Sequence, residues 1–208
     1  ASAMEIFGRA GYDAGSNRAI ADAAGTNQAL IGYHFGSKRG LYIAVFEFIA
    51  AEIQLELLPV VEAVRADFNA IHIDDPDRRE RCVTAIETLL FAMLDNLSRP
   101  ESKSRARLVM REQQDPSDAF EILYDGFMQR MLGTLSFFIA GVEGIDSSSA
   151  ATNLRAIFLF GQVLVFVLTP AIVDRHLALK GGTAGNLKTI KNQLHLILQQ
   201  QFIGGETP

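Results

Sequence analysis

The chain has 208 residues, of which 49% are hydrophobic and 21% are charged, and its net charge is −5. This composition excludes a disordered chain and provides a sizeable core for one large domain or for a small domain joined to a larger one. The single cysteine, Cys82, excludes an internal disulfide framework and a cysteine metal cluster, and it fits a reduced, cytoplasmic protein.

The N-terminal quarter predicts short helices separated by glycines. Ser16, Asn27 and Ser37 are suitable N-caps, and Gly25 suits the turn between the second and third helices. The first helix has no capping residue, so we expect its natural start to lie upstream. Apolar residues at helical spacing give the ranges 1–9, 17–24, 28–34 and 38–66.

The remainder of the chain continues in the same way and predicts no strands. Asp115 is a candidate N-cap with Pro116 at the first helical position, and Ser147 or Ser148 can cap the next helix. The expected helices cover about 79–97, 102–113, 116–140, 148–179 and 186–202. The fold class expected from the sequence is therefore all-α.

One stretch resembles a membrane span. Residues 156–173 are uncharged and just long enough to cross a bilayer. Gln162 and Pro170 interrupt the stretch, and the surrounding helices are amphipathic. We therefore expect a core or interface helix and no membrane association.

Residues 16–34 form a helix, a glycine turn and a second helix. Such a unit can place its second helix in the major groove of DNA, while helix N-termini at Ser16, Asn27 and Ser37 offer backbone N–H groups to phosphates. Within residues 1–50 four basic residues balance four acidic ones, so all of the net negative charge lies further along the chain. Pattern alone makes this a weak indication, because any small helical pair with a glycine turn looks similar.

The motif Ile6-Phe7, Gly11-Tyr12, Ile20-Ala21-Asp22-Ala23-Ala24-Gly25-Thr26-Asn27 and Tyr33-His34-Phe35-Gly36-Ser37-Lys38 resembles the DNA-binding signature of the TetR family of regulators. The resemblance implies an N-terminal three-helix helix-turn-helix domain over residues 1–47, with a larger helical ligand-binding and dimerisation domain over 48–208. It also implies a ligand-responsive repressor that binds a double-stranded DNA operator as a homodimer. The positions that it places at base edges are Arg18, Gln28, Ala29 and Gly32, and those at phosphates are Ser16, Asn17, Tyr33, His34 and Lys38. Asn27 joins the predicted DNA-binding residues through the free N–H groups at its helix start.

Several of these positions have other interpretations. Tyr33 could be a packing residue, His34 a polar cap at the helix end, and Lys38 an ordinary solvated charge. The family often has a threonine at the position of Gly15 and an aromatic residue at that of Gly32. A helical small-molecule-binding protein without DNA-binding activity is therefore the alternative.

The later helices resemble the TetR subgroup with a CerR-like C-terminal domain, through Arg111-Glu112-Gln113-Gln114-Asp115-Pro116-Ser117 and Gly161-Gln162-Val163. We expect a dimer, since two reading helices about 34–36 Å apart can read two half-sites. We expect the last two helices to form its interface. The apolar stripe on the final helix would need a partner, or could be buried within the same subunit. Its members are Leu187, Ile190, Leu194, Ile197 and Leu198.

An apolar or aromatic effector is expected, because small-molecule sites are mostly apolar with a few polar anchors. Arg111 with Glu112 could equally be a structural ion pair, and each aromatic residue could simply pack in the core. The candidate ligand-binding residues are Arg111, Gln113, Phe127, Met131, Phe158 and Gln162.

An enzyme is the other function class to consider. The four histidines, His34, His72, His176 and His195, lack metal-ligand spacing, and no phosphate loop, nucleophile elbow or dinucleotide fingerprint is present. The sequence therefore predicts no catalytic residues, no cofactor and no metal.

Overall fold

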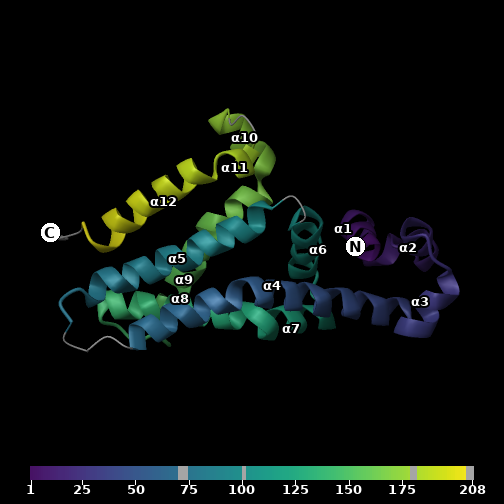
Figure 1. Cartoon of the computed structure of the whole chain (residues 1–208), viewed down its shortest axis with the longest axis horizontal. Coiled ribbons are helices and arrows are strands. Elements are labelled where there is room, and N and C mark those ends of the chain that lie inside the picture. Colours follow the sequence, from purple (N-terminus) through teal and green to yellow (C-terminus); the bar gives the residue numbers. More distant parts are fainter. Residues whose placement is uncertain (70–74, 100–101, 179–181, 205–208) are drawn as a thin grey trace. The chain divides into compact units, whose positions relative to one another are not determined.

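A computed structural model describes residues 1–69, 75–99, 102–178 and 182–204. These residues form helices and connecting turns, with no strand among them (Figure 1). The expected all-α fold is therefore confirmed. The predicted helix end near Leu179 lies outside the described residues, as does His72.

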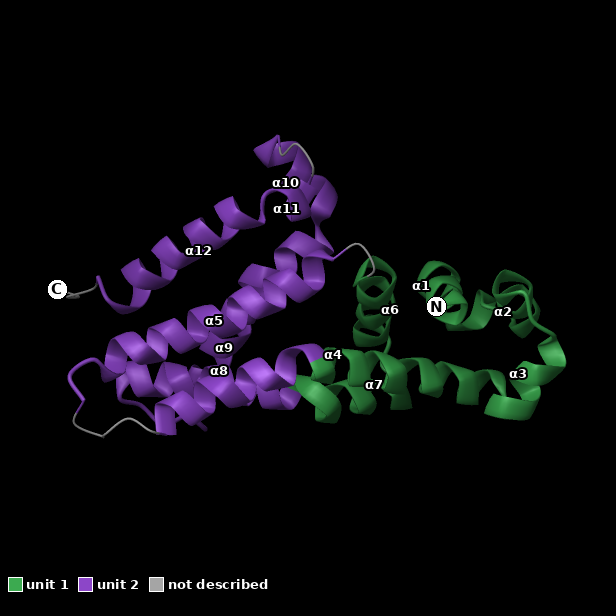
Figure 2. Cartoon of the chain, in the orientation of Figure 1, with its two compact units in different colours: residues 1–55, 100–128 green, residues 56–99, 129–208 purple. Residues whose placement is uncertain are grey.

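The chain divides into two compact units, which Figure 2 colours separately. Unit 1 combines residues 1–55 with 100–128, and unit 2 combines residues 56–99 with 129–208. Each unit contains segments that are far apart in sequence.

Unit 1 is built from α1 to α3, the first part of α4, and α6 and α7. Its core is formed around Phe7 of α1, Ile20 of α2, Ile31 of α3, Phe46 of α4 and Leu108 of α6, each at most 5% exposed. The helices run over Ser2–Ala14 (α1), Asn17–Ala24 (α2), Gln28–Phe35 (α3), Lys38–Asn69 (α4), Ser102–Gln114 (α6) and Asp118–Leu123 (α7), followed by a π-helical turn at Tyr124–Met128 (η1).

In its described residues, unit 2 contains the rest of α4 and the helices α5 and α8 to α12. Its core includes Val61, Cys82, Ile86, Phe138 and Leu198, all fully buried. The helices run over Arg78–Ser98 (α5), Gln129–Glu143 (α8), Ala150–Leu168 (α9), Pro170–Leu177 (α10), Gly182–Gly185 (α11) and Leu187–Phe202 (α12).

Two N-caps differ from the sequence expectation. Ser117, not Asp115, caps α7 by accepting the N–H of Ala119. Ser149, rather than Ser147 or Ser148, caps α9 by accepting the N–H of Thr152. Both helices therefore begin two or so residues later than expected.

The predicted long helix ending near residue 179 is interrupted. α9 ends at Leu168, and Pro170 starts the separate helix α10 because proline favours the first turn of a helix but cannot continue one.

The apolar stripe on the final helix is largely used within the chain. Ile190, Leu194, Leu198 and Phe202, spaced four residues apart, are buried, and α12 packs against α5 within unit 2. Of the two alternatives left open by the sequence, Ile190, Leu194 and Leu198 follow the second, burial within the same subunit, whereas Ile197 is 48% exposed.

α9 has the length and composition of a membrane span, but only 22% of its most apolar window is buried in the chain. Its inner face, with Ala156, Leu159 and Val163, is buried, and α9 packs on α8 and α5. Its outer face is apolar and exposed, including Phe158 at 62% exposure.

Candidate DNA-binding surface

The helix-turn-helix begins with two well-formed helix starts. Ser16 Oγ accepts the N–H of Ala19 at 3.1 Å, and Asn27 Oδ1 accepts the N–H of Ala29 at 2.8 Å. Each bond satisfies one of the free N–H groups at its helix start. Gly25 between the helices has φ 62° and ψ 32°, a left-handed conformation that glycine adopts at low cost.

α3 is held to the chain by very few of its residues. Only Ile31 is buried on this helix, whereas Gln28, Ala29 and Gly32 are exposed. Tyr33 is 82% exposed, so it is not a packing residue in the free chain. An exposed helix anchored by one apolar residue has a free face that can enter a groove of DNA.

Gly32 and Gly15 lie in different surroundings. A Cβ atom at Gly32 would meet nothing within 4 Å, whereas one at Gly15 would lie 2.7 Å from a ring carbon of Phe7. A side chain at position 15 would therefore force the Phe7 ring to shift. Gly32 lies in open space on the outward face of α3.

The predicted contacts on α2 differ in how free they are. Arg18 is exposed, with its Nε 4.0 Å from the Asp22 carboxylate one turn along the same helix. Asn17 has a buried Oδ1 that no described residue donates to. The Arg18 guanidinium can leave the exposed Asp22 carboxylate at little cost, because surface ion pairs of this kind contribute little to stability.

Lys38 is engaged within unit 1. Its Nζ donates to the backbone carbonyl of Asp13 at 2.8 Å and lies 4.7 Å from the centre of the Tyr12 ring. His34 contacts the rings of Tyr33 and Phe35 at the end of α3. In the free chain the Lys38 ammonium is therefore bound to the C-terminal part of α1.

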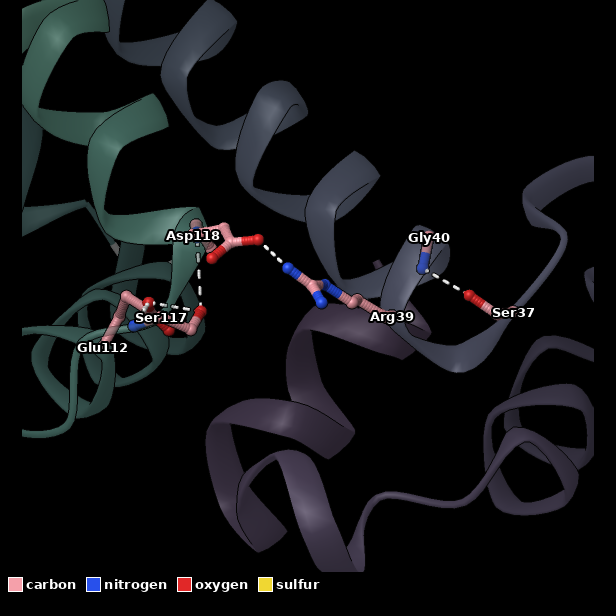
Figure 3. A network of polar contacts seen from close by, with 7 residues as sticks. Ser37, Arg39, Gly40, Glu112, Ser117 and Asp118 are labelled. Atoms are coloured by element: carbon pink, nitrogen blue, oxygen red, sulfur yellow. Dashed lines mark hydrogen bonds and ion pairs between the residues drawn. The ribbon is translucent and has the colours of Figure 1, made fainter.

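A polar network joins the starts of α4 and α7 to the end of α6 (Figure 3). Arg39 at the start of α4 forms an ion pair with Asp118 at the start of α7. Glu112 of α6, 2% exposed, accepts the N–H of Ser117 at 2.6 Å and its hydroxyl at 2.7 Å. These bonds offset the cost of burying the carboxylate.

Glu112 also accepts a hydrogen bond from the phenol of Tyr42 in α4, at 2.7 Å. Burial raises the pKa of Tyr42 well above its usual range, and the hydrogen bond to Glu112 and the negative charge there raise it further. The phenol is therefore held in its protonated, donating form.

The six predicted ligand-binding residues are divided between the two units, three in each. In unit 1, Arg111 bonds to backbone carbonyls of α1, Gln113 lies half-buried on α6, and Phe127 is buried. The other three belong to unit 2, where Met131 is buried and Phe158 is exposed on the outer face of α9. Gln162 is half-buried, and its Oε1 has no hydrogen-bond partner among the described residues.

Unit 2 contains a groove with a cavity volume of about 480 Å³, which none of these six residues lines. α4, α5 and α8 form its walls. Its lining is mostly apolar, through Val60, Val64, Phe68, Ala85 and Phe138, with Asp67, Arg81, Thr84 and Thr88 among the polar members. No group of three or more potential metal ligands occurs in the described part of the chain.

Sequence comparison assigns an N-terminal and a C-terminal segment of the chain to known families. Residues 1–45 match the model of bacterial regulatory proteins of the tetR family, and residues 79–203 match the C-terminal domain of the HTH-type transcriptional dual regulator CecR. The subgroup is thus that of CecR, where the sequence resemblance pointed to a CerR-like domain.

Individual relatives agree with these matches. CecR of Shigella flexneri is 30% identical over 168 residues, covering 81% of this chain and 73% of the relative. The HTH-type transcriptional regulatory protein RaaS of Mycobacterium tuberculosis is 53% identical over 53 residues, covering 26% of this chain and 24% of the relative.

Solved structures share the fold over nearly the whole chain. A Clostridium perfringens regulator superposes with a TM-score of 0.66 at 15% identity, covering 100% of this chain and 97% of the other. Bacillus subtilis FadR, solved in complex with stearoyl-CoA, gives a TM-score of 0.55 at 16% identity, covering 93% and 94%. The chain belongs to the TetR family of bacterial regulatory proteins, in the group whose C-terminal domain is that of CecR.

Proposed function

We propose that the chain is a cytoplasmic, ligand-responsive transcriptional repressor that binds a near-palindromic operator as a homodimer. The observation that carries this proposal is the exposure of α3, in which only Ile31 is buried. The helix starts at the N-cap Asn27, directly after the turn at the left-handed Gly25. The family membership of the chain supports the same function. The name of its CecR relative, a dual regulator, makes activation at some promoters a testable second mode.

The proposed contacts divide into two classes. Arg18 and Gln28 would read bases, with guanine and adenine as their natural partners, and each good bidentate pair discriminates by about 1–3 kcal/mol. The backbone N–H groups and side chains at Ser16, Asn27 and Tyr33 would hold phosphates and fix the register. Ala29 and Gly32 would allow close approach to base edges, and Asn17, His34 and Lys38 would complete the phosphate contacts.

Selection of bound sites from a random pool of duplex DNA tests this function directly. We expect enrichment of a near-palindrome with half-sites about one helical turn apart. We also expect the affinity to fall steeply with salt. Failure to bind any DNA at low salt would favour the alternative, a helical ligand-binding protein without DNA-binding activity.

For the homodimer, we propose the outer face of α9 and α10 as the main contact. Apolar side chains there are exposed at helical spacing, which leaves a stripe that a second copy can cover. Gly161 in the middle of this stripe is exposed with open space around its Cβ position, so two helices could approach closely. The stripe consists of Leu154, Ile157, Phe158, Val165, Leu168 and Ile172.

For the effector, we propose an apolar or aromatic molecule that binds the groove of unit 2. Its volume of about 480 Å³ and its mostly apolar lining suit a small apolar ligand. The stearoyl-CoA bound to FadR makes a long acyl chain a reasonable first probe. The six ligand residues predicted from the sequence remain a second prediction for the site.

Blocking the groove distinguishes these two locations. Ala63 is exposed and lines the groove, whereas Ala66, three residues further along α4, is exposed and does not line it. The probes are stearoyl-CoA and a set of planar aromatic molecules. The rise in melting temperature that a bound probe causes should be lost in Ala63→Trp and kept in Ala66→Trp. Equal rises in both variants would show that the effector binds outside the groove.

A further inference from the structure

α1 does not run smoothly to its end. Gly11, within Ser2–Ala14, has φ 82° and ψ 175°, which breaks the helix one turn before its last residue. A break of this kind leaves the preceding backbone carbonyls without helical N–H partners. α1 packs directly on α2, and α2 on α3, so the position of this broken end bears on the position of the proposed reading helix.

Arg111 of α6 binds the carbonyls at this break. Its Nε donates to the carbonyl of Gly8 at 3.1 Å, and its Nη2 donates to the carbonyl of Arg9 at 3.1 Å. The guanidinium also lies against Gly11, where a Cβ would stand 3.1 Å from Nη1. A fork of donors facing two successive carbonyls at a helix end is favourable both as charge-assisted hydrogen bonding and through the helix dipole.

The next residue of α6 reaches the same break by another route. Glu112 accepts from Tyr42, whose ring packs edge-on against that of Tyr12 at a centroid distance of 5.0 Å. Tyr12 directly follows Gly11, and its ring also lies under the ammonium of Lys38. Two consecutive α6 residues therefore fix the broken end of α1, one directly and one through Tyr42.

We propose that Arg111 and Glu112 are positioning residues for DNA binding, which hold the end of α1 and thereby set the orientation of α2 and α3. The proposal rests on the proposed DNA-binding function and assigns Arg111 to the DNA-reading unit instead of the effector site.

Arg111→Met tests the direct contact, and Arg107→Met is its matched control, because Arg107 lies one turn earlier on α6 and is exposed. Operator affinity of the intact protein should fall about tenfold in Arg111→Met, because the contacts that hold the end of α1 are lost, and should stay at the wild-type value in Arg107→Met. Arg111→Lys can still donate to one carbonyl, so it should recover part of the affinity.

The salt dependence separates positioning from direct contact. A residue that touches no phosphate leaves the slope of log affinity against log salt unchanged, whereas loss of a phosphate contact lowers it by about 1. Amide hydrogen exchange should accelerate in α1 of Arg111→Met, while α5, α8 and α12 keep wild-type rates. Tyr42→Phe, which removes the bond to Glu112, should show the same pattern more weakly.

A reduced salt slope, or an affinity equal to that of Arg107→Met, would overturn the proposal. An unchanged hydrogen-exchange rate in α1 of Arg111→Met would also overturn it. Faster exchange throughout unit 2 would overturn it as well, because it would indicate a general loss of stability. If the wild-type protein binds no DNA, the proposed function fails, but the exchange comparison still decides whether Arg111 holds the end of α1.

Discussion

At the scale of single residues, two glycines of the helix-turn-helix should respond in opposite ways to the same change. Gly32→Ala adds a methyl group where nothing lies within 4 Å, so it should stabilise unit 1 by about 0.5–1 kcal/mol through helix propensity alone. Gly15→Ala forces a Cβ to within 2.7 Å of the Phe7 ring, so it should destabilise by about 1–3 kcal/mol.

Denaturant unfolding of the two variants beside wild type measures this difference. The two substitutions are chemically identical, so each serves as the control of the other. A stabilised Gly15→Ala would mean that the ring of Phe7 moves aside freely, contrary to its fully buried position.

Tyr42 makes the stability of unit 1 depend on alkaline pH. Its pKa is raised in the folded state by burial and by Glu112, so above the unfolded value, about 10, the unfolded chain loses a proton that the folded chain keeps. Below that pH the phenol contributes no pH dependence, and above it stability should fall by about 1.4 kcal/mol per pH unit from this group until the folded pKa is reached.

Tyr42→Phe should remove this part of the alkaline loss while lowering stability by about 1–2 kcal/mol at neutral pH, because Glu112 loses a donor. Tyr33→Phe, which removes an exposed phenol, is the matched control. Unfolding free energies between pH 9 and pH 11, measured for the three proteins, check the sign and the slope. An identical alkaline limb in Tyr42→Phe would refute the assignment.

At the scale of elements, the start of α9 depends on one hydroxyl. Ser149 Oγ accepts the N–H of Thr152 at 3.2 Å and is 2.8 Å from the Thr152 hydroxyl, which in turn donates to the carbonyl of Asp146. Ser149→Ala should therefore lower the free energy of unfolding by about 1 kcal/mol.

Ser147→Ala is the matched control, two residues earlier and exposed. It should leave the midpoint of thermal unfolding unchanged, while Ser149→Ala lowers it. The reverse order would show that α9 starts at the residue favoured by the sequence pattern rather than at Ala150.

These starts also mark the limit of what the sequence could predict. Helical periodicity located most helices to within about three residues, because apolar spacing is a property of one segment. Several serines or an aspartate precede α7 and α9, and the choice among them depends on which oxygen reaches an N–H in three dimensions. Pro170 was recognised as an interruption of the apolar stretch, but the sequence analysis still continued one helix through it, whereas α9 ends at Leu168 and α10 starts at Pro170.

Long-range partners explain the other differences. The sequence could not decide whether the stripe of α12 is covered by a partner or by its own subunit, since α5, which covers it, lies about a hundred residues earlier. Arg111 and Glu112 were recognised as noteworthy, with a structural ion pair as the alternative to ligand contact. Their actual partners, α1 for Arg111 and Tyr42 for Glu112, are 70 to 103 residues away. The helix-turn-helix, in contrast, is local, and its caps at Ser16, Asn27 and Ser37 formed as expected.

For the whole molecule, the burial of the α12 stripe concentrates the proposed dimer contact on α9 and α10. Much of the apolar surface that the chain leaves exposed on unit 2 lies on these two helices, from Leu154 to Leu177. A dimer that covers this face would also account for the membrane-like composition of α9, because a helix buried by its own chain on one side and by a second copy on the other must be apolar all round.

Phe158→Arg tests this arrangement. Placing a charge in the centre of an apolar interface leaves it desolvated and unpaired, so the dimer dissociation constant should rise by at least about a hundredfold. Leu55→Arg is the control, because Leu55 is 80% exposed on α4 and lies outside the proposed contact. Sedimentation velocity at micromolar concentration should therefore find Phe158→Arg monomeric and Leu55→Arg dimeric.

The Phe158→Arg monomer retains one helix-turn-helix, so it should keep weak DNA binding but lose its preference for a palindrome over a single half-site. A dimeric Phe158→Arg with wild-type operator affinity would place the interface on another face of the chain.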